Sequence, residues 1–325
     1  MIAVGLLSGW HAANWGAYKD VPYEGFRWAS YVRSVLVGGV VATVIATVVP
    51  ADELPPLLVL LGVFYALERL GTELWKSILR EDDQSSYTIP MRLGFRSRTI
   101  DRRLKRYVAG AAVVLALLTL CLAGDTLQRS GSPAPLLVTV LVGGAGGWIT
   151  AVGGAWKDAP VEGFSGWKFL RSPAVATAWA IPLSTMTTNW VTLAFSAAGF
   201  AVSSIETYKT FLTRGRPPGK FADKQIRHSW PRARARFAFL HAALWSALAL
   251  TTAYSISLGQ WRGASALAAA VIASVAGVAA MSVVAAVPWR SLWLAGPEAN
   301  PPTVAVPHSH SPHRASSEGD RQGLS

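Results

Sequence analysis

Apolar residues fall into blocks of about 20 residues along most of this chain, rather than into the amphipathic stripes of soluble helices. Helices of that length, rising about 1.5 Å per residue, match the ~30 Å hydrocarbon core of a bilayer. Only 15% of the residues are charged, whereas soluble domains average about 25%. The pattern predicts an all-α, polytopic transmembrane helical bundle. We expect about nine spans, at 1–18, 31–50, 55–79, 106–124, 135–156, 172–189, 190–212, 237–258 and 264–288.

Basic residues lie almost entirely on one side of this predicted bundle. The loops 19–33, 76–106, 157–171 and 209–236, with the tail from Arg290, contain all but three of the 30 Lys and Arg residues. Because such residues concentrate in cytoplasmic loops, we expect the N-terminus outside and the C-terminus in the cytoplasm. The same bias accounts for the net charge of +12. It predicts contacts with the lipid bilayer, anionic lipids included, and no nucleic-acid partner. A homo-oligomer is compatible with the sequence.

Two stretches of the sequence are near-copies of each other. Residues 19–26 read KDVPYEGF and residues 157–164 read KDAPVEGF, 138 positions later. An Arg-Ser pair follows each stretch at the same offset, beginning at Arg33 and Arg171. A fixed offset shared by this many residues indicates an internal duplication.

A second match lies near the predicted cytoplasmic ends of two other helices, where Glu73 and Lys76 recur 133 positions later as Glu206 and Lys209. Four crossings return a chain to the side where it started, so the two copies are predicted to run parallel, related by an axis along the membrane normal. We expect four-helix repeats at 1–134 and 135–262, a ninth transmembrane helix at 263–292 and a disordered cytoplasmic tail at 293–325.

The repeated charges admit two interpretations. Proline and glycine in each copy predict a defined cytoplasmic turn. In the structural interpretation, the charges pair to staple helices together, and four tryptophans near the loops anchor the protein at the membrane interface: Trp15, Trp28, Trp156 and Trp167. In the functional interpretation, the lysines and arginines bind an anionic group. The carboxylates Asp20, Glu24, Asp158 and Glu162 either balance these cations or hold a divalent cation. The full set of residues in the functional interpretation comprises Lys19, Asp20, Glu24, Arg33, Glu73, Lys76, Lys157, Asp158, Glu162, Arg171, Glu206 and Lys209. The functional interpretation is favoured because stapling would accept Arg for Lys, yet both copies keep the same residue types.

Other intramembrane polar residues have no counterpart in the second copy. His11 and Asn14 align with Ile149 and Val152, so we expect them to form hydrogen bonds between helices. His241 stands alone in the predicted span 237–258 and is expected to pack. The Glu68-Arg69 pair is either an asymmetric substrate site or a local ion pair.

These features lead to three functional hypotheses. A transporter or lipid translocator for an anionic substrate suits parallel duplicated halves with basic loops. An integral-membrane enzyme acting on a phosphorylated lipid or isoprenoid at the cytoplasmic face is the alternative, with Lys157, Asp158, Glu162 and Arg171 orienting the phosphate. A structural membrane subunit is the third. The sequence identifies no cofactor and contains no metal-binding motif.

Overall fold

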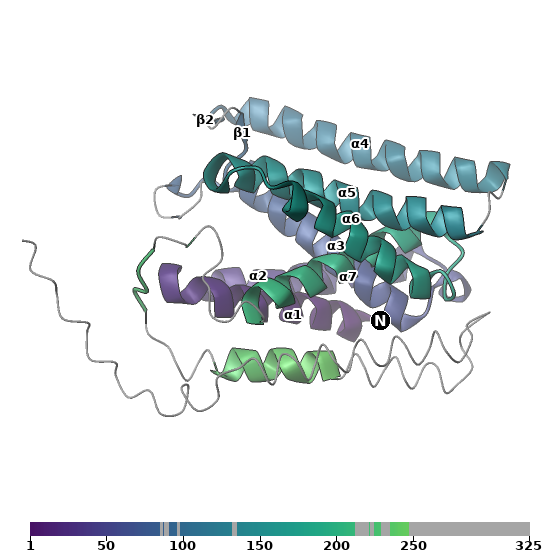
Figure 1. The fold of residues 1–325 in the computed structure, drawn as a ribbon, viewed down its shortest axis with the longest axis horizontal. Coiled ribbons are helices and arrows are strands. Elements are labelled where there is room, and N and C mark those ends of the chain that lie inside the picture. The colour runs from purple at the N-terminus through teal and green to yellow at the C-terminus, as the bar shows by residue number, and fades with distance from the viewer. Residues whose placement is uncertain are drawn as a thin grey trace, which may run out of the picture.

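The structure is a computed structural model that describes residues 1–84, 87, 91–95, 98–131, 135–211, 221, 224–228 and 235–246. The predicted ninth helix and C-terminal tail lie outside these residues, as does the second half of the predicted span 237–258. Almost all of the described chain is helical (Figure 1). The elements are α1 (Ile2–Glu24), α2 (Trp28–Val48), η1 (Ala51–Glu53), α3 (Leu57–Leu74), η2 (Trp75–Leu79, π-helical), β1 (Gly94–Phe95), β2 (Arg98–Thr99), α4 (Arg103–Ser130), α5 (Pro135–Glu162), α6 (Gly166–Leu183) and α7 (Trp190–Phe211), followed by a helix at 235–246.

Three helices are long and apolar enough to cross a bilayer: Trp28–Val48, Arg103–Ser130 and Leu137–Ala159 within α5. This composition is compatible with an integral membrane protein, as the sequence predicts. The total of nine spans stays a prediction. The boundary between the sixth and seventh predicted spans agrees with the structure, because α7 begins at Trp190. Asn189 caps this helix by accepting a hydrogen bond from the backbone N–H of Thr192 at 2.8 Å.

The repeated ionic motif is the end of a helix, so the prediction that it forms a loop is wrong. Helix α1 runs through Pro22 to Glu24, and α5 likewise ends at Glu162. Proline removes one backbone donor, and only two helical residues follow it in each case, so few intrahelical hydrogen bonds are lost. Gly25 and Gly163 then both adopt a φ of 78°, a left-handed conformation that favours glycine and ends each helix.

Helices α3 and α7 cross at the centre of the bundle. Gly62 and Gly199 face each other at this crossing, where a Cβ atom on Gly199 would overlap the carbonyl oxygen of Gly62. Helices α1 and α2 pack against α3, and α5 and α6 pack against α7. Figure 1 shows α4 along one edge of the bundle and the 235–246 helix along the opposite edge. Most apolar side chains of α4 are exposed, as expected for a helix that faces lipid.

The α1–α2 and α5–α6 pairs use the same close contacts. A Cβ atom on Gly9 would overlap the backbone of Ser34. A Cβ atom on Gly147, 138 positions later, would lie 2.6 Å from the carbonyl oxygen of Ser172, the residue 138 positions after Ser34. Two further pairs repeat this relation, because Gly5 abuts Ala42 and Gly143 abuts Ala180. Small residues let helix backbones approach closely in a membrane, where packing drives helix association.

We expect Gly147→Ala to lower stability by about 1–3 kcal/mol, because the added methyl group would push α5 and α6 apart. Gly154→Ala on the same helix is the matched control, since no described atom beyond its own helix turn lies within 4 Å of a Cβ there. Thermal denaturation of the purified protein in detergent would compare the two. Equal stabilities would contradict the close packing of α5 on α6.

Candidate functional site

Two ion pairs at one end of the bundle connect helices that are distant in sequence. Lys19 on α1 pairs with Glu206 on α7, with the lysine Nζ 3.2 Å from the glutamate Oε2. Lys157 on α5 pairs with Glu73 on α3 at 3.1 Å. Lys157 occupies the position of Lys19 in the sequence repeat, and Glu73 that of Glu206. The two pairs are therefore reciprocal, since each lysine binds the glutamate of the other predicted copy.

Each glutamate also binds basic side chains of its own helix. Lys76 donates to Glu73 at 3.1 Å, and Lys209 donates to Glu206 at the same distance. Arg69 donates to Glu73 at 2.7 Å. Five basic side chains thus share two carboxylates in these ion pairs. We call this cluster the charge layer; it comprises Lys19, Arg69, Glu73, Lys76, Lys157, Glu206 and Lys209.

The other residues of the predicted site are Asp20, Glu24, Arg33, Asp158, Glu162 and Arg171, and they differ in their burial and in their contacts. Asp20 lies near Lys19 and interacts with it electrostatically, and Arg33 on α2 interacts in the same way with Glu73. Asp158 is half-buried and has an interaction partner. Glu24 and Arg171 are also half-buried, but neither takes part in the ion pairs of the charge layer. The side chain of Glu162 lies outside the described residues.

Trp15 lies beneath the charge layer and is only 4% exposed, so its predicted role as an interfacial anchor is wrong. Its ring faces inward, with the Lys19 ammonium 4.5 Å and the Arg69 guanidinium 5.1 Å from the ring centroid. A tryptophan face attracts cations through its quadrupole, more strongly away from water. Trp15 therefore holds two basic side chains of the charge layer in place.

Lys19 stays charged despite its surroundings. Burial disfavours the ammonium form, but the carboxylates of Glu206 and Asp20 outweigh this effect and raise the pKa of Lys19 above its usual value of 10.5. The Lys19–Glu206 pair is therefore an ion pair throughout the neutral pH range.

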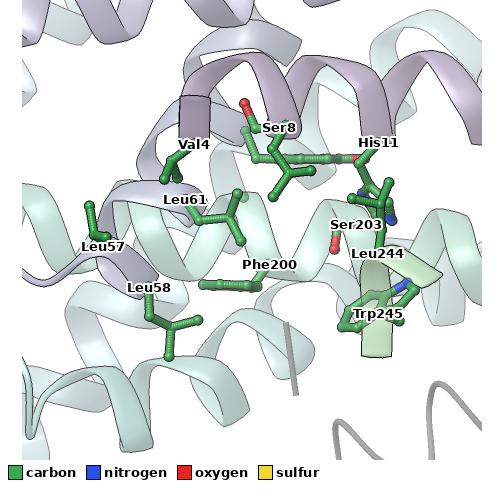
Figure 2. A pocket seen from close by; sticks show the side chains of 13 residues that line it. Val4, Ser8, His11, Leu57, Leu58, Leu61, Phe200, Ser203, Leu244 and Trp245 are labelled. Carbon is green, nitrogen blue, oxygen red and sulfur yellow. The ribbon is translucent and has the colours of Figure 1, made fainter. Parts of the chain in front are cut away.

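A cavity of about 220 Å³ lies between α1, α3, α7 and the 235–246 helix (Figure 2). Most of its wall is apolar, and Leu57, Leu58 and Val4 line one end. His11 and Ser203 lie at the other end, next to Trp245. An apolar chamber with a few polar groups at one end is typical of a site for a small amphipathic molecule.

Next to the polar end of the cavity, the imidazole of His11 stacks on that of His241. The two ring centroids lie 4.2 Å apart, with an interplanar angle of 17°. The Nε2 atom of His241 lies 2.8 Å from the Thr207 hydroxyl, and the Trp245 indole donates to the same hydroxyl at 3.1 Å. The prediction that His241 packs is confirmed, since it is fully buried, but it is not alone there. The expected hydrogen bond between helices is confirmed for Asn14, whose side-chain oxygen accepts from the Tyr31 hydroxyl at 2.9 Å.

A hydrogen bond links the cavity to the charge layer. Tyr65 lines the cavity, and the Trp15 indole donates to its hydroxyl. The face of the same Trp15 ring contacts Lys19 and Arg69. Tyr65 and Glu73 are eight residues apart on α3, a rise of about 12 Å. The cavity and the charge layer are thus two successive levels of one bundle, with Trp15 between them.

Comparisons with protein-family models, with curated proteins and with solved structures give no match to this chain.

We expect a double-mutant cycle on Lys19→Met and Glu206→Gln to give a coupling free energy of about 0.5–3 kcal/mol, because both side chains are largely buried. The control is Arg129→Met with Asp125→Asn, an i,i+4 pair on α4 whose arginine is 79% exposed. Its coupling should fall in the range of surface pairs, about 0.2–1 kcal/mol. Thermal denaturation measures both cycles, and a weaker coupling for the inner pair would contradict its structural importance.

Proposed function

We propose that this protein is a membrane transporter or lipid translocator for an anionic substrate. In this proposal, two parallel four-helix copies, 1–134 and 135–262, move against each other around the cavity. The charge layer closes the cytoplasmic end of the pathway in the conformation described above. The reciprocal pairing of Lys19 with Glu206 and of Lys157 with Glu73 carries the proposal.

Reciprocal pairing is the pattern expected of two related halves that meet about a two-fold axis, where a contact from i to j is accompanied by one from j to i. The recurrence of the Gly9–Ser34 contact at Gly147 and Ser172 supports the same relation. Transporters built from parallel repeats place the substrate near the midplane, at the interface of the repeats. If the repeats are as proposed, the cavity would lie at their interface, since α1 and α3 belong to the first predicted copy and α7 to the second.

The charge layer has properties that suit a gate. The side chains of Lys19 and Glu206 are 13% and 16% exposed, and that of Glu73 is 35% exposed. Because the cost of taking two charges out of water offsets much of their attraction, water that entered between separating halves would replace these ion pairs at small net cost. The excess of basic side chains would attract an anion to the opening and would bind it in place of the glutamates.

A transport cycle also requires that substrate binding be coupled to opening of the gate, and in this proposal the cavity provides that coupling. A ligand that contacts Tyr65 would disturb its hydrogen bond with Trp15, and the Trp15 ring supports Lys19 and Arg69. A ligand would then shift the charge layer between its closed and open arrangements only if the ligand binds more tightly to one of them. The apolar wall favours a substrate with an apolar body, and the basic layer favours an anionic head.

We expect loss of a reciprocal pair to open the cavity to the cytoplasm. Ser203 lines the cavity, so Ser203→Cys in a Cys121→Ser background reports access by its rate of labelling with a membrane-impermeant maleimide. Labelling from the cytoplasmic side should accelerate in Lys19→Ala and Lys157→Ala, because each leaves a gap in the charge layer. Arg129→Ala, which breaks an exposed pair on α4, should not change the rate. Unchanged labelling together with lower thermal stability would favour the stapling interpretation.

In vesicles of defined lipid, we expect Lys157→Ala and Asp158→Asn to abolish flux while the purified protein still folds. The assay would follow uptake of labelled organic anions and flipping of fluorescent anionic lipids. Arg129→Ala again serves as the control that retains flux. Turnover of a phosphorylated lipid in detergent, without a second compartment, would instead support the enzyme alternative. If neither flux nor turnover is observed, the result would support the third hypothesis, a structural membrane subunit.

A further inference from the structure

A second cluster of charges lies between η2 and the start of α4. The carboxylate of Glu81 is approached by Arg106, by Arg103 at 3.3 Å and by Arg92 at 3.9 Å. Arg80 precedes Glu81 in the chain and lies 4.0 Å from Asp82. We call this the arginine cluster; it comprises Arg80, Arg92, Arg103 and Arg106.

Three of the four arginines are more deeply buried than the carboxylates that neutralise them, whereas Arg103 is 69% exposed. The side chain of Arg106 is fully buried, and those of Arg80 and Arg92 are 8% and 14% exposed. Glu81 is 40% exposed, and the other acidic partners more so. Exposed carboxylates are screened by water, so the interior of the cluster has an excess of positive charge.

Several guanidinium nitrogens of the cluster have no hydrogen-bond acceptor among the described residues. These are Nε and Nη1 of Arg106, Nε and Nη2 of Arg80, and Nε of Arg92. Buried polar groups nearly always have partners in native proteins, and a bound ion is one source of them. Five donor nitrogens on three buried cations are suited to an anion with several oxygens.

The surrounding contacts fix the arginines in position. The backbone N–H of Leu93 donates to the carbonyl of Ser77, which ties the loop after η2 to that element. The Arg80 guanidinium lies 4.0 Å from the centroid of the Tyr87 ring, and the Tyr87 hydroxyl accepts from Arg27 at 3.0 Å. Arg106 belongs to the first turns of α4. Arg80, Arg92 and Arg106 are therefore held by the surrounding chain rather than being solvated side chains.

We propose that the arginine cluster binds a phosphate group, either in an anionic lipid headgroup or in a soluble phosphate compound. A guanidinium fork matches two phosphate oxygens at once, which an ammonium group cannot do. The site lies where the exposed apolar face of α4 begins, so the acyl chains of a lipid could lie along Leu115 and Leu118. The corresponding arginine of the second predicted copy, Arg236, is exposed, so the described part of that copy contains no equivalent of the buried Arg106. It does not depend on the proposed transport function.

The test measures phosphate binding to the full-length protein. Isothermal titration with inorganic phosphate in detergent detects a soluble ligand, and nanodiscs of phosphatidylcholine with or without phosphatidate detect a headgroup through a rise in thermal stability. Binding of inorganic phosphate alone would assign a soluble compound, and a response to phosphatidate alone would assign a lipid. Both outcomes support the phosphate site, and the absence of both overturns it.

Variants locate the site. Arg106→Lys keeps the charge beside Glu81 but loses the planar fork, and we expect it to weaken binding about tenfold. Arg80→Lys should do the same and provides an independent variant if Arg106→Lys fails to fold. Lys105→Gln is the matched control, because Lys105 neighbours Arg106 on α4 but is exposed. Equal weakening in Lys105→Gln, or unchanged binding in both arginine variants, would contradict the assignment.

Discussion

The arrangement of the charged end depends on the need of each buried charge for an opposite charge nearby. Removing one partner of such a pair leaves an uncompensated charge in a medium of low dielectric constant, which costs far more than the intact pair contributes. Each glutamate has a basic partner close by in sequence, at Lys209 for Glu206 and at Lys76 for Glu73. Lys19 on α1 and Lys157 on α5 instead find their partners on another helix, at Glu206 and at Glu73. The two lysines therefore help to determine which helices meet at this end.

Close backbone packing sets the geometry on which these pairs rely. The crossing of Gly62 with Gly199 brings α3 and α7 into contact, and both glutamates then project from the same end of that helix pair. Leu61 and Phe200, which neighbour these glycines in the chain, line the cavity beside the crossing. A bundle that is tight at its centre and looser beside it can change shape by pivoting, without rebuilding its core.

Sequence patterns predicted the features that depend on local chemistry. Apolar block length predicted the helices, and the 138-residue offset predicted that Lys19 and Lys157 have equivalent positions. Sequence patterns gave wrong or incomplete predictions where tertiary contacts determine the surroundings of a residue. From the sequence alone Trp15 resembles an interfacial anchor, because the sequence does not show that its side of α1 faces inward. The ring that stacks on His241 belongs to His11, which is 230 residues away in the chain. The i,i+4 spacing of Trp15 with Lys19 was the available signal, since it places the ring and the ammonium on one face of α1.

The polar residues fall into two groups, those that recur in both predicted copies and those found in the first copy only, and we expect the two groups to have different roles. A lysine and a glutamate of the charge layer recur in each predicted copy, as expected of elements that form and break together in the proposed movement of two halves. Among the described residues, His11, Arg69 and the buried Arg106 have no such counterparts in the second predicted copy: Ile149 and Val202 align with the first two, and Arg236 is exposed. A ligand without two-fold symmetry needs contacts that are themselves asymmetric. In the proposed cycle, the duplicated charges therefore serve the motion, and the residues found in one copy determine which ligand is bound.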